Sequence, residues 1–320
     1  MNRNDAITRF LAFDGLADWQ RVPLAGDASA RRYERLIGPD GQSLILMDAD
    51  PRVCGSSAPF TAMRTHLYSY GFSAPALHAE DLDLGLLVME DFGDALFARV
   101  MADDPAQEQP LYELAADLLI RLQGKPTPEG LEAKDAAGLA AMIAPAFEAY
   151  APALAHRLTA VQAAFHSALQ PVAAVPPVLS LRDFHAENMI LLPDRKGDRR
   201  IGLLDFQDAF LTHPAYDLVS MLQDARRDLA PGTEEAVLQH FILQTGTAED
   251  NFRAAYAILG AQRNLRILGI FSRLAAERGK PQYLALQPRV WRHLKSDLAH
   301  PALAEVRALL ADLPEPERVP

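Results

Sequence analysis

Three oxygen-bearing side chains in residues 179–209 stand at spacings that could support metal-dependent chemistry. Asn188 follows Asp183 by five positions, and Asp205 follows it by 22. A D-x-x-x-x-N pattern with a second Asp about two dozen residues later is typical of kinase-type phosphoryl transfer. In that reaction one Asp accepts the proton of the attacking hydroxyl, while the Asn and the second Asp hold Mg²⁺ against the phosphates. We therefore predict Asp183 as a catalytic base and Asn188 and Asp205 as magnesium ligands.

Two short apolar runs would position these residues. Residues 189–192 follow Asn188, and residues 201–204 lead into Asp205, with a charged turn between the runs. A β-hairpin built from them would bring the three side chains to one end. The alternative interpretation is that Asp183 and Asn188 cap a loop and that Asp205 ends a strand as an ordinary turn residue.

A literal D-F-G motif at residues 91–93 lies on the wrong side of the proposed base. In protein kinases this Asp follows the catalytic loop, so we interpret the motif as the start of a linker. An apolar run at residues 84–89 precedes it, and the polar, Gly-containing break is typical of a hinge or of a plain turn. At a hinge, the backbone around Glu90 and Phe92 would bind adenine.

Composition excludes several classes of function. The net charge of −11 argues against nonspecific nucleic-acid binding, because no basic stripe is available to neutralise phosphates. Cys54 is the only cysteine, which excludes a disulfide-built secreted fold. No apolar stretch has the length of a membrane span or the form of a signal peptide. We expect a monomeric cytoplasmic protein whose partner is a small molecule, with neither nucleic acid nor a membrane.

The periodicity of apolar residues predicts an α+β region followed by a helical one. The first begins with an amphipathic helix whose face carries Ile7, Phe10 and Leu11. After it we expect strands at residues 19–24, 31–36, 44–47, 76–80 and 85–89, and a helix at 59–70. Further helices are expected at residues 106–122, 135–150, 153–169, 214–228, 234–244, 248–276, 283–298 and 301–313.

The fold class that follows is α+β, a bilobal protein-kinase-like fold. We place a small β-rich nucleotide-binding lobe at residues 1–90 and a mostly helical catalytic and substrate-binding lobe at residues 91–320.

Several motifs resemble a known family. L-R-D-F-H-A-E-N-M-I and L-L-D-F-Q-D-A, followed by T-H-P-A-Y-D-L, are similar to the aminoglycoside phosphotransferase/choline kinase-like superfamily, whose catalytic motif is usually H-G-D-x-H-x-x-N. Within it, G-D-A-S-A-R-R-Y, M-E-D-F-G and Q-R-N-L-R-I-L-G-I-F-S-R-L resemble the bacterial N-acetylmuramate/N-acetylglucosamine kinases. These enzymes phosphorylate the anomeric hydroxyl of cell-wall sugars during recycling.

The resemblance implies ATP and Mg²⁺ as cofactors and gives roles to individual residues. Asp183 looks like the catalytic base, with His185 beside it to orient the loop. Asn188 and Asp205 look like the Mg²⁺ ligands. A loop over the ATP phosphates would consist of Gly26, Asp27, Ala28 and Ser29.

The chain departs from the family pattern in two places. Leu181 and Arg182 stand where the family has H-G, which leaves the shape of that turn open. The expected third strand lacks the Lys, and the next helix lacks the Glu, that together hold ATP phosphates in a typical kinase. Adjacent strand residues face opposite sides, so only one of Arg31 and Arg32 can replace the Lys, and we favour Arg32. The alternative is that both are solvated strand residues.

Substrate ligands are expected in the helical lobe, and the candidates are Glu187, Asp208, Arg263, Asn264 and Arg266. An arginine there could pair with the lactyl carboxylate of N-acetylmuramate. Alternatively, the helix at residues 262–273 belongs to the core, and its arginines lie on its solvent-exposed face. Asp217 is interpreted as a structural residue that caps a helix or holds the catalytic loop.

Two other functions stay open from the sequence. One is a kinase for another small substrate, such as an aminoglycoside or a choline-like amine, which would need an acidic pocket. The other is a pseudokinase that serves as a binding module, which the missing Lys–Glu pair favours and the retained Asp183, Asn188 and Asp205 oppose. No motif of a metallohydrolase is present in the sequence.

Overall fold

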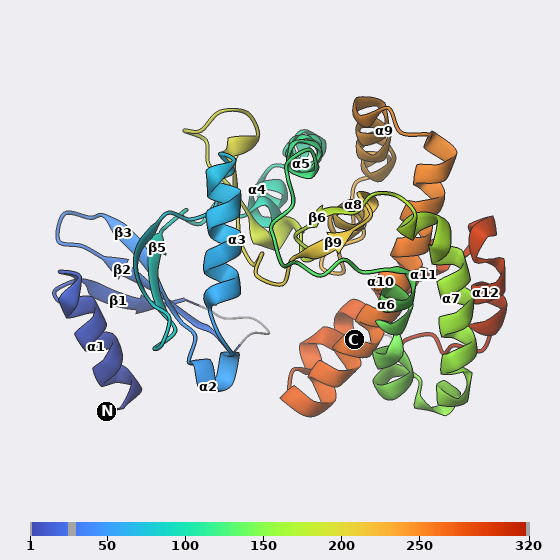
Figure 1. Ribbon diagram of the computed structural model, residues 1–320, viewed down its shortest axis with the longest axis horizontal. Coiled ribbons are helices and arrows are strands. Elements are labelled where there is room, and N and C mark those ends of the chain that lie inside the picture. The colour runs from blue at the N-terminus through green and yellow to red at the C-terminus, as the bar shows by residue number, and fades with distance from the viewer. Residues whose placement is uncertain (1, 25–29, 318–320) are drawn as a thin grey trace. The chain divides into compact units, whose positions relative to one another are not determined.

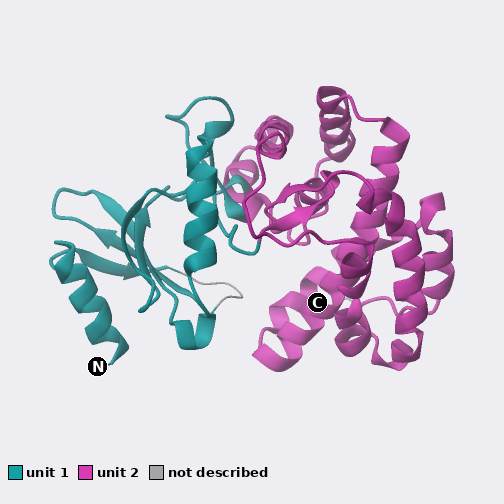
Figure 2. Ribbon diagram, viewed as in Figure 1, with its two compact units in different colours: residues 1–97, 188–208 teal, residues 98–187, 209–320 magenta. Residues whose placement is uncertain are grey.

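The computed structural model describes residues 2–24 and 30–317, and the chain forms two compact units (Figure 2). Unit 1 comprises residues 1–97 and 188–208, and unit 2 comprises residues 98–187 and 209–320. Unit 1 holds a five-stranded sheet, whereas unit 2 is mostly helical. The structure therefore has the β-rich and helical parts that the sequence predicts. The domain boundary after residue 90 stays a prediction, and the hairpin at residues 188–208 packs with the N-terminal residues.

The sheet of unit 1 is antiparallel, in the order β1-β2-β3-β5-β4 (Figure 1). All five predicted strands are confirmed: β1 Gln20–Pro23, β2 Arg32–Ile37, β3 Ser43–Asp48, β4 Leu77–Asp81 and β5 Leu86–Glu90. Helix α3 (Ala58–Ser69) was also expected. The short helix α2 (Pro51–Cys54) was not, because a single turn leaves too few residues to show a period.

Helix α1 (Arg3–Phe13) covers part of the core of unit 1 with the predicted apolar face. Its buried side chains Ile7, Phe10 and Leu11 belong to one cluster with residues of the sheet, namely Leu36, Leu46, Leu86 and Val88. Burying such a side chain contributes roughly 1.5–3 kcal/mol. Asn2 and Asp5 form a capping box that begins the helix.

The hairpin predicted around the candidate site is present in unit 1. Strand β7 (Met189–Leu191) pairs antiparallel with β8 (Ile201–Leu203), and Met189 lies opposite Leu203. Gly202 faces the ring of Phe92, where an added Cβ would lie 2.7 Å from a ring carbon. Only glycine lets the hairpin approach the segment after β5 this closely.

Unit 2 combines a two-stranded sheet with helices. Strand β6 (Val178–Ser180) pairs antiparallel with β9 (Phe210–Thr212). The helices are α4 Phe97–Asp103, α5 Glu108–Gln123, α6 Ala136–Ala141, α7 Leu158–Ala173, α8 Ala215–Leu222, α9 Thr233–Thr245, α10 Glu249–Arg278, α11 Gln287–Leu298 and α12 Ala304–Leu309, of which α4 begins at the last residue of the first segment of unit 1. Within the described ranges, none of the helices is long and apolar enough to cross a membrane.

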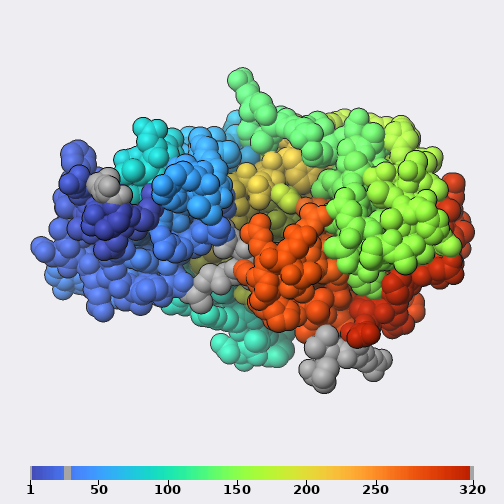
Figure 3. All heavy atoms as spheres, turned by 90° about the horizontal axis from the view of Figure 1, so that it is seen from below, coloured from blue at the N-terminus to red at the C-terminus, as the bar shows by residue number. Residues whose placement is uncertain are grey.

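The longest helix, α10, runs through the centre of unit 2. Its central residues 255–265 are all buried, whereas beyond Phe271 its residues are partly or fully exposed. Figure 3 shows the C-terminal part, in orange, at the molecular surface. The helix therefore contributes both core residues and solvent-accessible ones.

Several predicted helices are interrupted or shorter than expected: α8 ends at Leu222, and the helices expected from residues 283 and 301 begin as the 3₁₀ turns Pro281–Leu286 and Pro301–Leu303. The segment expected as one helix at residues 135–150 consists of α6 and a π-helical turn, η2 (Ala146–Tyr150), because Pro145 lacks an N–H and disfavours helical backbone before it. Gly269 of α10 leaves room for this turn, since an added Cβ would lie 2.1 Å from the backbone of Pro145. The helix expected from residue 153 starts as a 3₁₀ turn, Pro152–Arg157, before α7.

Candidate active site

The loop that carries Asp183 is anchored by a buried carboxylate. Asp217, in the first turn of α8, accepts hydrogen bonds from the Ser180 hydroxyl at 2.6 Å, the Leu181 N–H at 2.7 Å and the Arg182 N–H at 3.0 Å. Burial raises the pKa of Asp217 to about 6, although these hydrogen bonds favour its charged form. The structure therefore agrees with the interpretation of Asp217 as the residue that holds the catalytic loop.

Arg182 adopts a left-handed backbone conformation at the position where the family motif has glycine. Its φ is 70°, and it shares left-handed backbone with only one other non-glycine residue in the described ranges, Asp205. This conformation costs an L-residue about 1–2 kcal/mol. The hydrogen bond from the Arg182 N–H to Asp217 helps to offset that cost. The replacement of H-G by Leu181 and Arg182 thus leaves a tight turn before Asp183.

Asp183 lies among cations within unit 2. Its Oδ1 is 3.6 Å from Nη2 of Arg263, its Oδ2 is 3.9 Å from Nε of Arg182, and its side chain is 34% exposed. Burial, the largest influence, raises the pKa of Asp183, but Arg263, Arg182, His185 and Arg266 together hold it below its usual value. Asp183 is therefore ionised at neutral pH and able to accept a hydrogen bond or a proton.

His185 is buried beside this loop. Burial lowers its pKa, against the opposing influence of Asp224, so the imidazole is neutral at pH 7. A neutral, buried ring fits the predicted role of orienting the loop better than a role in proton transfer with solvent.

Two of the predicted substrate ligands on α10 have different surroundings. Arg263 donates to the Ser220 hydroxyl at 2.7 Å, and its guanidinium lies over the Tyr216 ring at 5.7 Å. Asn264 is fully buried and donates to Gln223 at 2.7 Å and Asp297 at 3.1 Å. This geometry favours a core role for Asn264, and its contact with substrate stays a prediction.

Asn188 and Asp205 lie at the same end of the β7–β8 hairpin in unit 1. The Leu204 N–H donates to the Asn188 carbonyl at 3.0 Å, and Asp205 is the next residue. Asp205 is 48% exposed, accepts a hydrogen bond from the Gln207 amide at 2.7 Å and has φ 55°. Asp183 precedes Asn188 by only five residues but belongs to unit 2, so the convergence of all three on one ion stays a prediction.

Arg31, and not Arg32, lies near a predicted metal ligand. The Arg31 Nη1 is 4.0 Å from Oδ1 of Asp205, and the Arg31 side chain is 17% exposed. Arg32 pairs instead with Asp48 of β3 at 2.6 Å and is 68% exposed. Alternation along a strand puts Arg31 and Arg32 on opposite faces of the sheet. It does not tell which of the two faces the site, so the sequence alone could not choose between them. The proposed phosphate loop, Gly26, Asp27, Ala28 and Ser29, lies outside the described residues.

The segment proposed for adenine binding is fixed within unit 1. The Glu90 carboxylate accepts hydrogen bonds from Arg195 and from the Ala76 N–H. Phe92 packs on Gly202 and lies under the Arg195 guanidinium at 5.2 Å. Arg195 therefore holds this segment through both residues. The adenine-binding role of Glu90 and Phe92 stays a prediction.

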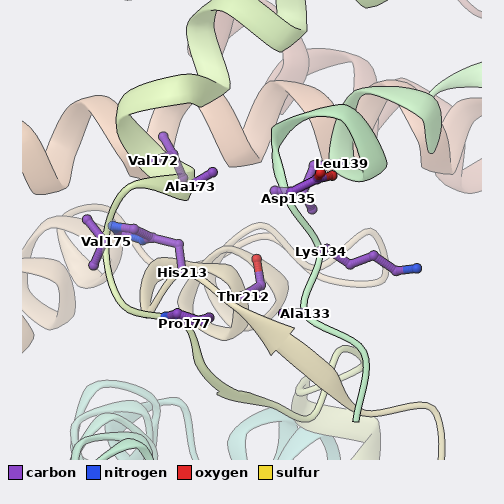
Figure 4. Close-up of a pocket in the computed structure, with 10 residues that line it drawn as sticks. All are labelled: Ala133, Lys134, Asp135, Leu139, Val172, Ala173, Val175, Pro177, Thr212 and His213. Carbon is purple, nitrogen blue, oxygen red and sulfur yellow. The ribbon is translucent and has the colours of Figure 1, made fainter.

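Of the other candidate substrate ligands, Glu187 and Asp208 are exposed and Arg266 is half-buried. A cavity of about 130 Å³ in unit 2, lined by Lys134, Asp135, Thr212 and His213 among others, includes none of the predicted site residues (Figure 4). It therefore adds nothing to the candidate active site.

Comparison with known proteins identifies the family of this chain. Residues 20–255 match the family model of the phosphotransferase enzyme family. The N-acetylmuramate/N-acetylglucosamine kinase of Caulobacter vibrioides is 36% identical over 96% of this chain and 95% of that protein. The kinase of the same name from Pseudomonas aeruginosa is 31% identical over 92% of this chain and 88% of that protein.

Solved structures agree on the fold. A choline/ethanolamine kinase family protein from Mesorhizobium loti superposes with a TM-score of 0.63 at 16% identity, covering 97% of this chain and 99% of that one. Aminoglycoside 2′-phosphotransferase-IIIa superposes with a TM-score of 0.63 at 14% identity, covering 93% and 99%. The predicted bilobal kinase-like fold is thereby confirmed. Because the family model matches most of this chain, the chain belongs to the phosphotransferase enzyme family.

Proposed function

We propose that this protein transfers the γ-phosphoryl group of ATP to the anomeric hydroxyl of N-acetylmuramate and of N-acetylglucosamine. Relatives that carry both sugars in their names match it over nearly the whole chain. The observation that carries the chemistry is the ionised, partly exposed Asp183 on a loop fixed by Asp217.

Asp183 acts as the base in this proposal. It accepts the proton of the sugar hydroxyl while the oxygen attacks the γ-phosphorus and ADP leaves. A carboxylate whose pKa is held below its usual value is a weak base. An anomeric hydroxyl is more acidic than an ordinary alcohol, so it suits such a base. The anchored loop keeps the carboxylate in place during the reaction.

Asn188 and Asp205 are proposed to hold Mg²⁺. Carboxylate and amide oxygens suit this ion, and the exposure of Asp205 leaves oxygen atoms open to coordination. When bound, the ion would neutralise charge on the β- and γ-phosphates. Arg31, 4.0 Å from Asp205, is proposed as the cation that replaces the missing Lys. The protein is further proposed to act as a monomer in the cytoplasm.

A cationic substrate fits the described residues less well. Arg182 and Arg263 lie within 4.0 Å of Asp183, and Arg266 also influences its pKa. An aminoglycoside or choline-like amine would be repelled by these groups.

The test is product analysis with ATP and Mg²⁺ over a panel of acceptors. We expect 1-phosphates from both sugars by ³¹P NMR, and none from their 1-O-methyl glycosides, kanamycin or choline. The methyl glycosides are the matched control, because only the anomeric hydroxyl is blocked. Phosphorylation of a glycoside would contradict the position, turnover of an amine alone would contradict the substrate class, and no turnover at all would favour a pseudokinase.

A further inference from the structure

Three guanidinium groups gather around Asp183 in unit 2. Arg263 and Arg182 lie 3.6 Å and 3.9 Å from its carboxylate oxygens. Arg266 follows Arg263 by three residues on α10, a spacing that puts the two on the same helix face with Cβ atoms about 5–6 Å apart. Arg266 interacts electrostatically with Asp183, Tyr216, Arg182 and Arg263. Asp217 also interacts electrostatically with Arg263, so three guanidinium groups face two carboxylates and positive charge is in excess.

Arg266 differs from its neighbours in what it contacts. Arg263 is occupied by Ser220, Tyr216 and Asp183. Arg266 is half-buried, yet within the described ranges it makes no hydrogen bond or ion pair. Because no Arg266 nitrogen is among the fully buried polar atoms that lack a hydrogen-bond partner, its nitrogens are accessible to solvent.

An unpaired cation in this position is unfavourable by itself. Burial lowers the pKa of Arg266, and the nearby Arg182 and Arg263 lower it further. A half-buried charge is normally paired with a group of opposite sign. The three guanidiniums also hold the pKa of Asp183 down, which weakens the base. An anionic ligand would offset both penalties.

We propose that Arg266 binds the lactyl carboxylate of N-acetylmuramate. This rests on the proposed function, and the two sugars differ in that lactyl ether alone. A guanidinium binds a carboxylate through two parallel hydrogen bonds. Because the Arg266 nitrogens reach solvent, water can replace the carboxylate when N-acetylglucosamine is bound. Arg266 is thus the residue that favours the anionic sugar over the neutral one.

The test is the ratio of kcat/KM for N-acetylmuramate to that for N-acetylglucosamine. In Arg266→Gln we expect this ratio to fall about tenfold or more, since hydrogen bonds between charged groups are the stronger ones. Arg266→Lys should restore part of it. The control is Arg273→Gln, seven residues further along α10, whose side chain pairs with Glu148 at the surface; its ratio should match the wild type.

An unchanged ratio in Arg266→Gln would overturn the proposal. An equal fall for both sugars with a raised KM for ATP would also overturn it, and would assign the anion to a phosphate of ATP. If the wild type phosphorylates neither sugar, the proposed function fails. Calorimetry of N-acetylmuramate binding then still tests this inference. Weaker binding by Arg266→Gln than by the wild type supports it, and equal binding contradicts it.

Discussion

Among residues 2–24 and 30–317, two loops contain left-handed non-glycine residues, and these loops are held in opposite ways. Around Arg182, in unit 2, the buried Asp217 accepts hydrogen bonds from two successive backbone N–H groups and a hydroxyl. Around Asp205, in unit 1, the carboxylate is 48% exposed, with the Gln207 amide at 2.7 Å and Arg31 at 4.0 Å. The Arg182 loop is held by hydrogen bonds to a buried carboxylate, whereas the Asp205 loop leaves its own carboxylate accessible to solvent.

This difference matches the two tasks that we propose. A base must be held in a fixed position relative to the hydroxyl, because small displacements reduce the rate strongly. A metal ligand must keep oxygen atoms available for the ion. Changes in the two loops should therefore have different consequences for activity and for stability.

Asp205→Asn should have a large effect on activity and little effect on stability. Loss of a charged metal ligand is expected to lower kcat roughly 10²–10³-fold and to raise the Mg²⁺ concentration that gives half-maximal rate. The exposed side chain contributes little to folding, so the free energy of unfolding should stay within about 0.5 kcal/mol. Steady-state kinetics across a magnesium series and urea unfolding measure both quantities.

Asp40→Asn, an exposed turn residue of unit 1, is the control for the loss of a carboxylate. Wild-type activity and magnesium dependence in Asp205→Asn would contradict the role of Asp205.

Asp217→Asn should reduce both stability and activity. An amide nitrogen is not an acceptor, so a buried N–H or hydroxyl loses its partner, which costs about 1–3 kcal/mol, and kcat should fall roughly tenfold as the loop shifts. Asp228→Asn, at a surface ion pair with Arg289, should cost less than about 1 kcal/mol. A kcat equal to the wild type in Asp217→Asn would show that the loop does not depend on this anchor.

Asp217 also predicts a dependence of stability on pH. Its pKa is about 6 in the folded protein against the ordinary 3.8, so the folded state binds this proton more tightly. Its contribution to stability is therefore largest at low pH and decreases as the pH rises through about 6. Asp217→Asn should lack that decrease, and the difference between the two proteins in urea titrations from pH 4.5 to 7.5 measures it.

Arg182→Gly should have a small effect on stability and a visible effect on pH dependence. Glycine adopts φ 70° without strain, so the free energy of unfolding should change by less than about 1 kcal/mol. Removal of the cation 3.9 Å from Asp183 should raise the pKa of that carboxyl toward its usual value. The acid limb of the kcat/KM profile should therefore move to higher pH, and an unchanged limb would argue that another group is the base.

The features that could be predicted from the sequence are those set by residues close together in the chain. Asn188, the two apolar runs and Asp205 lie within one hairpin of unit 1, so their arrangement follows from residues close together in the chain. The strands of unit 1 and the long helices were also predictable from periodicity.

What the sequence missed depends on contacts between distant residues. The choice between Arg31 and Arg32 depends on Asp48, which lies opposite Arg32 in the sheet. Arg263 and Asn264 are neighbours on α10 and point in different directions, one toward Asp183 and the other toward Asp297. Nothing in the pattern of residues 262–273 distinguishes them. The contact of Gly202 with Phe92 was likewise invisible, because it joins segments more than a hundred residues apart.

The most direct test of the account is single-turnover phosphoryl transfer by Asp183→Asn, with N-acetylglucosamine as acceptor and with ATP and Mg²⁺ present. The substitution keeps the shape of the side chain and removes its basicity. We expect the rate of transfer to fall about 10²–10⁴-fold, while the affinity for ATP with Mg²⁺ stays close to the wild type. A rate within a few-fold of the wild type would contradict the claim that Asp183 accepts the proton of the sugar.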